Sequence, residues 1–134
     1  MTIIGAMLLA LSVALPAAAG SEGDIGETDK LLATEKLPDV PGKSMTAILV
    51  TYAPGGKSAK HHHAGSVLAY VLSGEIRSEN SATGPAKVYK AGESFFEPAG
   101  SVHLVSENAS ETEPATLLAI FIADDGAELT TFDK

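Results

Sequence analysis

The sequence contains no cysteine, and its basic residues are far outnumbered by acidic ones, with 9 Lys and Arg against 17 Asp and Glu. Without cysteine there is neither a disulfide framework nor a thiol for a lipid anchor. Nucleic-acid binding usually requires clustered Lys and Arg, and no such cluster occurs in this chain of formal net charge −8. We therefore expect an acidic, disulfide-free protein that does not bind nucleic acid.

Charge is also missing from the first nineteen residues, MTIIGAMLLALSVALPAAA. The apolar run at 3–15 is too short to span a bilayer comfortably, and the Pro-Ala-Ala-Ala that follows matches an A-x-A cleavage pattern. We expect residues 1–19 to be a helical signal peptide, which makes the protein secreted or periplasmic with no membrane span after processing. Because no basic residue precedes the run, a buried N-terminal helix and a start site further upstream remain alternatives.

Helical periodicity is the third absence, since no apolar repeat of 3.6 residues persists for three turns. A chain of 134 residues with 45% hydrophobic residues predicts one domain with a single core. We expect a linker at 20–29 and an all-β domain at 30–134, built from short strands separated by Gly and Pro turns. The expected strands cover 45–53, 67–76 with a bulge or turn at Gly74, 86–90, 94–97, 102–107 and 116–123. The C-terminal tail either adds a last strand or hangs loose.

Three of the four histidines lie together, at His61, His62 and His63. Side chains in a strand alternate between faces, so His61 and His63 point one way and His62 points the other. Two imidazoles on one face can bind one metal ion, and a third ligand must come from a neighbouring strand. The fourth histidine, His103, follows a Pro-Ala-Gly turn that can place it beside this pair.

The first histidine segment resembles the first motif of the cupins, specifically the small single-domain bacterial cupins. That motif has a Gly, five residues, His-x-His, three or four residues, Glu, six residues and Gly. Gly55, His61, His63 and Gly74 fall in register with it. The position of the motif's Glu is occupied by Val67, which cannot coordinate a metal.

The second histidine segment resembles the second cupin motif, which has a Gly, five residues, Pro-x-Gly, two residues, His, three residues and Asn. It fits at Gly92, Pro98, Gly100 and His103. The position of the motif's Asn falls on Glu107, and Asn108 comes one residue late. The two motifs together lie within about 46–122, nearly all of the expected domain.

This resemblance implies an antiparallel jelly-roll barrel holding one divalent transition metal through His61, His63 and His103. The metal can be Fe, Mn, Ni, Cu or Zn, and the sequence does not select among them. Three-histidine cupins include dioxygenases, so a metal-dependent enzyme acting on a small organic substrate is the first functional hypothesis. The resemblance also implies a homodimer.

The missing Glu at Val67 leaves several alternatives open. The site can be a three-histidine centre, or another carboxylate can replace the lost one. Glu97 and Glu107 flank His103, and they are the only carboxylates we consider for proton transfer near the metal; regular alternation puts Glu107 on the face of His103. A non-catalytic cupin that binds a small ligand or metal, and a metal-independent isomerase or epimerase, are the competing functions. Lys57 and Lys60 could attract an anionic substrate, or simply protect a strand edge.

Overall fold

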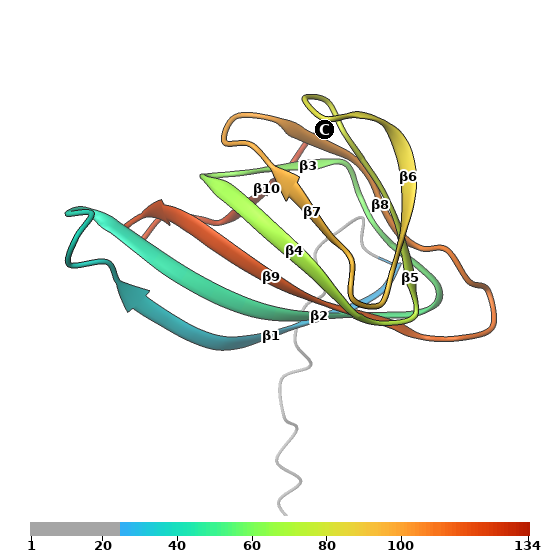
Figure 1. Ribbon diagram of the computed structural model, residues 1–134. Coiled ribbons are helices and arrows are strands. Elements are labelled where there is room, and N and C mark those ends of the chain that lie inside the picture. Colours follow the sequence, from blue (N-terminus) through green and yellow to red (C-terminus); the bar gives the residue numbers. More distant parts are fainter. Residues whose placement is uncertain (1–24) are drawn as a thin grey trace, which may run out of the picture.

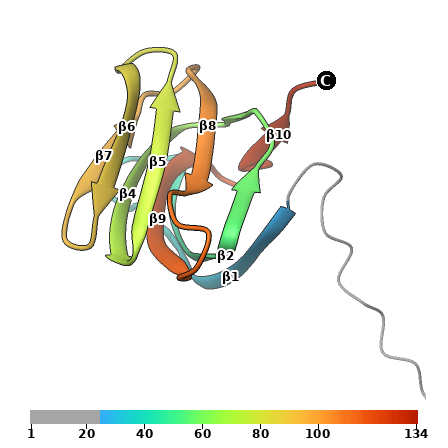
Figure 2. The same ribbon diagram turned by 90° about the vertical axis from the view of Figure 1, so that its right-hand side faces the viewer.

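The computed structural model describes residues 25–134, and every strand pairing within this range is antiparallel (Figures 1 and 2). The described residues form only strands and turns, with no helix. The strands are β1 (Ile25–Lys36), β2 (Lys43–Ser58), β3 (His61–His63), β4 (Ser66–Ser73), β5 (Glu75–Asn80), β6 (Gly84–Lys90), β7 (Ser94–Glu97), β8 (Val102–Asn108), β9 (Ala115–Asp124) and β10 (Thr130–Phe132). The predicted all-β class is thus confirmed.

The strands form two walls that curve toward each other as a nearly closed barrel, the shape expected of a jelly roll (Figure 1). Hydrogen bonds link β10, β3, β8, β5 and β6 in one wall, and β1, β2, β9, β4 and β7 in the other. Strand β2 belongs to both walls. Its residues 43–52 pair with β9, while Lys57 and Ser58 pair with β8.

The expected strand at 45–53 therefore ends too early. The chain bends at Gly55, which has a φ of +70°, and then continues in β2 to Ser58. Such a backbone conformation favours glycine because a side chain would be strained there. The bend carries β2 from one wall to the other and leads directly into β3, which bears the histidines.

The core lies between the two walls and is filled by side chains that alternate inward. On β9 this alternation is regular, with Ala115, Leu117, Ala119 and Phe121 buried. Burial at every second position is what a strand with one face on a core requires. The remaining core residues are Val50, Tyr52, Val67, Ala69, Val71, Ile76 and Phe95.

Both ends of the described chain form strands. The linker predicted at 20–29 is wrong for 25–29, because β1 begins at Ile25 and pairs with β2 along its length. The C-terminal tail adds a strand, β10, which pairs with β3.

The predicted signal peptide at 1–19 lies outside the described residues. Within residues 25–134 we find no helix with the length and apolar character needed to cross a membrane.

Candidate metal centre

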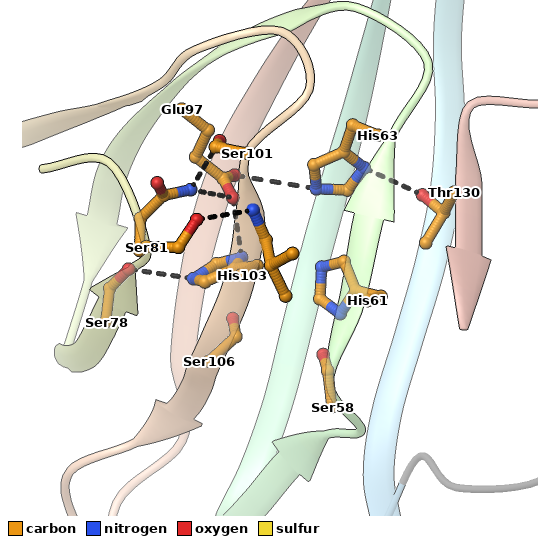
Figure 3. A network of polar contacts seen from close by, with 12 residues as sticks. Ser58, His61, His63, Ser78, Ser81, Glu97, Ser101, His103, Ser106 and Thr130 are labelled. Atoms are coloured by element: carbon orange, nitrogen blue, oxygen red, sulfur yellow. Dashed lines mark hydrogen bonds and ion pairs between the residues drawn. The ribbon is translucent and has the colours of Figure 1, made fainter. Parts of the chain in front are cut away.

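Three histidines converge on the inner face of the wall formed by β3 and β8 (Figure 3). His61 lies directly opposite His103 in the pairing of these strands, and His63 follows His61 on the same face. One ring nitrogen from each of the three lies within 4.8 Å of the others. His61 and His103 are buried, at 5% and 4% exposed. The sequence thus brings together the three residues expected to be ligands.

The neighbouring His62 lies outside this group, as alternation predicts. Its Nδ1 is 2.9 Å from a carboxylate oxygen of Asp133 near the C-terminus, and 44% of its side chain is exposed. His62 is therefore not a candidate ligand.

The imidazoles of His61 and His63 on β3 are each held through one ring nitrogen, Nδ1. His61 donates from Nδ1 to the backbone carbonyl of Ala59 at 2.6 Å, and His63 donates from Nδ1 to the carbonyl of Leu129 at 3.1 Å. Thr130 Oγ1 lies at the same 3.1 Å from His63 Nδ1. These bonds fix the ring orientation and leave Nε2 of both histidines as the potential ligand atom. Metal-binding histidines characteristically have one nitrogen held in this way.

His103 follows the same pattern with its two nitrogens exchanged. Its Nε2 is 2.8 Å from the hydroxyl of Ser78, and its Nδ1 donates to Glu97 at 2.9 Å. A serine hydroxyl can donate or accept, so Ser78 can serve either tautomer of His103. Nδ1 is therefore the nitrogen of His103 that points into the site, toward Glu97.

Glu97, at the end of β7, is the carboxylate of this site. It is 4% exposed, and its second oxygen lies 3.5 Å from Nε2 of His63. Burial alone would raise the pKa of the Glu97 carboxyl, but the hydrogen bond from His103 and the nearby imidazole of His63 outweigh it and hold the pKa well below its usual range. A buried ionised carboxylate thus faces two of the candidate ligand atoms.

The position of Glu97 relates directly to the motif position that lacks its Glu. Val67 on β4 and Glu97 on β7 are paired residues, and both are buried and line the same cavity. Paired residues in an antiparallel sheet have Cβ atoms about 5 Å apart. A carboxylate therefore reaches the cavity from the strand next to Val67.

Glu107, the other carboxylate considered from sequence, points elsewhere. Its carboxylate pairs with Arg77 at 2.6 Å, and it does not line the cavity. The expectation that it shares the face of His103 is wrong because β8 is irregular. Asn80 pairs with His103 while the preceding Glu79 pairs with Val105, which leaves one extra residue in β8 and reverses the alternation beyond it.

The same extra residue explains why the second motif reaches its asparagine one position late. Asn108, rather than Glu107, is buried at 4% exposed. Its side-chain amide donates to the carbonyls of Ala53 and Glu113 at 3.1 and 2.7 Å. Asn108 thus has the structural position that the spacing alone assigned to Glu107.

Burial also sets the protonation state of His61. Loss of hydration lowers the pKa of its imidazole to about 4, helped by the neighbouring His103 and His63 and opposed by the bond to Ala59. A neutral imidazole is the form that binds a metal. His61 is therefore ready to act as a ligand near neutral pH.

The histidines and Glu97 open onto a cavity of about 140 Å³ inside the barrel. One side is apolar, formed by small and aromatic residues of the opposite wall such as Ala69, Ala119 and Phe121. The other side continues from the histidines to Ser58, Ser106, Tyr52, Glu27 and Asp29. A small organic molecule can occupy this space beside the imidazoles.

The sequence did not predict the polar side of the cavity formed by Ser58, Tyr52 and Glu27. Glu27 lies in the segment predicted to be a linker, and Tyr52 reads as an ordinary core aromatic. The one available signal was strand alternation, which puts Ser58 inward if β2 continues beyond the Gly55 bend. That continuation was not expected, because Pro and Gly usually end a strand.

Comparison with known proteins identifies the family. Residues 48–121 match the family described as the cupin domain. The chain is 34% identical over 91 residues to germin-like protein subfamily 2 member 2 of Arabidopsis thaliana, covering 65% of this chain and 41% of that protein. The chain thus spans less than half the length of this relative.

Solved structures share the fold at lower sequence identity. A cupin-like protein from Thermotoga maritima superimposes with a TM-score of 0.67 at 21% identity, covering 86% of this chain and 82% of that one. The polyketide cyclase RemF from Streptomyces resistomycificus gives a TM-score of 0.62 at 20% identity, covering 84% and 75%. With the family match over more than half of its length, the chain belongs to the cupin family.

Proposed function

We propose that this protein binds one divalent transition metal through His61, His63 and His103, with Glu97 as the fourth ligand. Imidazoles together with a carboxylate suit Fe, Mn, Ni, Cu and Zn. The observation that carries the proposal is that each histidine has one nitrogen held by an uncharged partner, while the other faces the space that the three histidines share with Glu97. This arrangement fits a metal site better than three histidines that merely line a barrel, which would need no such convergence.

We further propose that the site is catalytic and acts on a small organic substrate in the adjoining cavity. A bound metal would polarise a substrate oxygen or activate dioxygen beside it. The protein's own residues would do the rest: the apolar wall with Phe121 excludes water, and the ionised Glu97 accepts a proton close to the substrate. The similarity of fold to a polyketide cyclase supports an enzyme, without indicating the reaction.

One observation favours a second candidate, a metal-independent acid–base enzyme such as an isomerase. The 2.9 Å hydrogen bond between His103 and Glu97 is the arrangement by which a carboxylate orients a histidine for proton transfer. In this alternative the two residues exchange a proton with the substrate directly, and His61 and His63 only shape the cavity.

Chelation distinguishes the two candidates. Small hydroxylated and carbonyl compounds would be incubated with the protein, and both product formation and oxygen consumption would be followed. Metal-dependent catalysis predicts turnover that is lost after treatment with a chelator and restored by one of the five metals. Turnover that survives complete metal removal would overturn the metal-dependent mechanism and support the acid–base alternative.

A further inference from the structure

The histidine layer of the barrel is followed by a layer of serines. Ser58 on β2 lies directly opposite Ser106 on β8, and Ser106 in turn lies opposite Ser78 on β5. In the adjacent inward-facing layer, His103 on β8 lies opposite His61 on β3, as Figure 3 shows. Of these serines, Ser58 and Ser106 line the cavity, so hydroxyl groups are exposed to it in the layer next to the histidines.

These hydroxyls form a chain that ends on a carboxylate of β1. The hydroxyl of Tyr52 lies 2.7 Å from that of Ser58 and 2.8 Å from that of Ser106. Ser58 in turn donates to the carboxylate of Glu27. Burial, followed by the nearby charge of Glu27, raises the pKa of Tyr52, so its phenol keeps its proton.

The carboxylate fixes the direction of every hydrogen bond in this chain. An ionised carboxylate only accepts, and each hydroxyl has a single proton to give. Because Ser58 gives its proton to Glu27, it accepts from Tyr52, and Tyr52 then accepts from Ser106. All the protons point toward Glu27, so Ser106 is left with lone pairs and no proton for a ligand.

The charged residues near Ser106 also favour a hydrogen-bond donor over an anion. Asp29, two residues after Glu27 on the same face of β1, also lines the cavity. Among the described residues that line the cavity there is no Lys or Arg. Lys57 and Lys60, which the sequence offered as attractants for an anion, are exposed and outside the lining. An anionic group at this end would meet acceptors and two carboxylates, whereas a hydroxyl or ammonium group would find partners.

We propose that Glu27, acting through Ser58, Tyr52 and Ser106, makes the cavity selective for substrates whose end remote from the histidines carries a hydrogen-bond donor, a hydroxyl or an ammonium group, and not an anion. This inference rests on the proposed function only in placing the other end of the substrate at the histidines. Ser106 is the residue that touches the substrate, and Glu27 is a positioning residue that orients the hydroxyls.

Three probes of nearly equal shape test the selectivity: 1,2-propanediol, 1-amino-2-propanol and lactate. Their dissociation constants would be measured by NMR titration of the ¹⁵N-labelled protein, and the metal content of each sample would be determined alongside. The readout is the ratio of the lactate constant to the aminoalcohol constant. Any attraction of lactate to a metal is common to all variants and cancels when their ratios are compared.

In Glu27→Gln we expect this ratio to fall by about tenfold or more, because the amide removes the charge and can donate to Ser58, which reverses the hydroxyl chain. Glu35→Gln is the matched control, since it removes an exposed glutamate from the same strand, and its ratio should equal that of the wild type. Asp29→Asn should shift the ratio in the same direction by less, and it serves if Glu27→Gln does not fold.

An unchanged ratio in a folded Glu27 or Asp29 variant, an equal change in Glu35→Gln, or failure of all three probes to bind would overturn the inference. The proposed function fails separately. If the wild type holds no metal and Glu27→Gln still shifts the ratio, the metal proposal is wrong and the selectivity stands.

Discussion

Val67 and Glu97 face each other across the pairing of β4 and β7, and Glu97 brings to the cavity the carboxylate that Val67 lacks. The carboxylate thus lies on the neighbouring strand, in the same layer of the barrel. Because the two positions are adjacent and equally buried, their side chains can be exchanged experimentally.

The exchange gives the first prediction. Glu97→Val should lose metal, and the double variant Val67→Glu, Glu97→Val should regain most of it, because it returns a carboxylate to the same layer. Metal affinity would be measured by competition with a chelator. A double variant that binds no better than Glu97→Val would contradict the idea that the two positions are equivalent.

The single variant Val67→Glu, which keeps Glu97, should be less stable than the wild type when no metal is bound. It places two carboxylates directly opposite each other at a site that is 1% exposed. We expect the metal-free protein to lose about 3 kcal/mol of unfolding free energy, measured in urea, and bound metal to recover part of this loss. Unchanged stability in the metal-free form would show that the two side chains do not share the cavity.

The pH dependence of stability follows from His61. Its pKa is about 4 in the folded protein against 6.5 in the unfolded chain, so between these values the unfolded chain binds a proton that the folded protein does not. Stability is therefore complete above pH 6.5 and decreases as the pH falls through this window. Glu97 acts in a lower window, because its lowered pKa gives stability that is lost only below about pH 4.5.

The measurement compares urea unfolding of the chelated wild type and His61→Gln at pH 7 and pH 5. We expect the wild type to lose about 2 kcal/mol more than the variant over this interval. The control is the interval between pH 7 and pH 8, above the titration of His61 in both states, where the wild type and His61→Gln should show the same pH dependence. Equal pH dependence in wild type and His61→Gln would contradict the burial of a neutral imidazole.

Gly65 offers a prediction about the scaffold of the site. It lies between β3 and β4, and a β-carbon added there would lie 1.9 Å from the carbonyl oxygen of Ile122 on β9. Gly65→Ala therefore has to displace backbone, and we expect a loss of about 2 kcal/mol or more in unfolding free energy, with weaker metal binding as β3 shifts. Ala64→Ser, which adds one atom at the exposed neighbour, should change neither quantity.

The sequence predicts well those parts of the fold where burial alternates or a turn residue is decisive. The strand expected at 94–97 is β7 exactly as bounded, and the expected interruption at Gly74 separates β4 from β5. The histidine positions follow from motif spacing in the same way. In each case a local pattern is sufficient because the neighbouring strand does not change it.

The missed features depend on pairing rather than on local pattern. β1 is exposed at every position except Glu27, so it lacks the alternation that marks a strand, and it is recognised only by its hydrogen bonds to β2. The extra residue in β8 leaves no sign in the sequence except the late Asn108. This extra residue turns Glu107 away from the cavity, so that Glu97 is the carboxylate beside the histidines. Alternation counted along one strand cannot reveal such a bulge, because the bulge is defined by the partner strand.

Metal content, measured by elemental mass spectrometry, tests whether the three histidines hold a metal. The protein would be purified without a His-tag or metal column, as wild type, as the double variant His61→Ala, His103→Ala, and as Glu107→Gln. We predict near-stoichiometric Fe, Mn, Ni, Cu or Zn in the wild type and in Glu107→Gln, and none in the double variant. Absence of metal from the wild type even after reconstitution, or equal metal in all three proteins, would show that these histidines are not a metal centre.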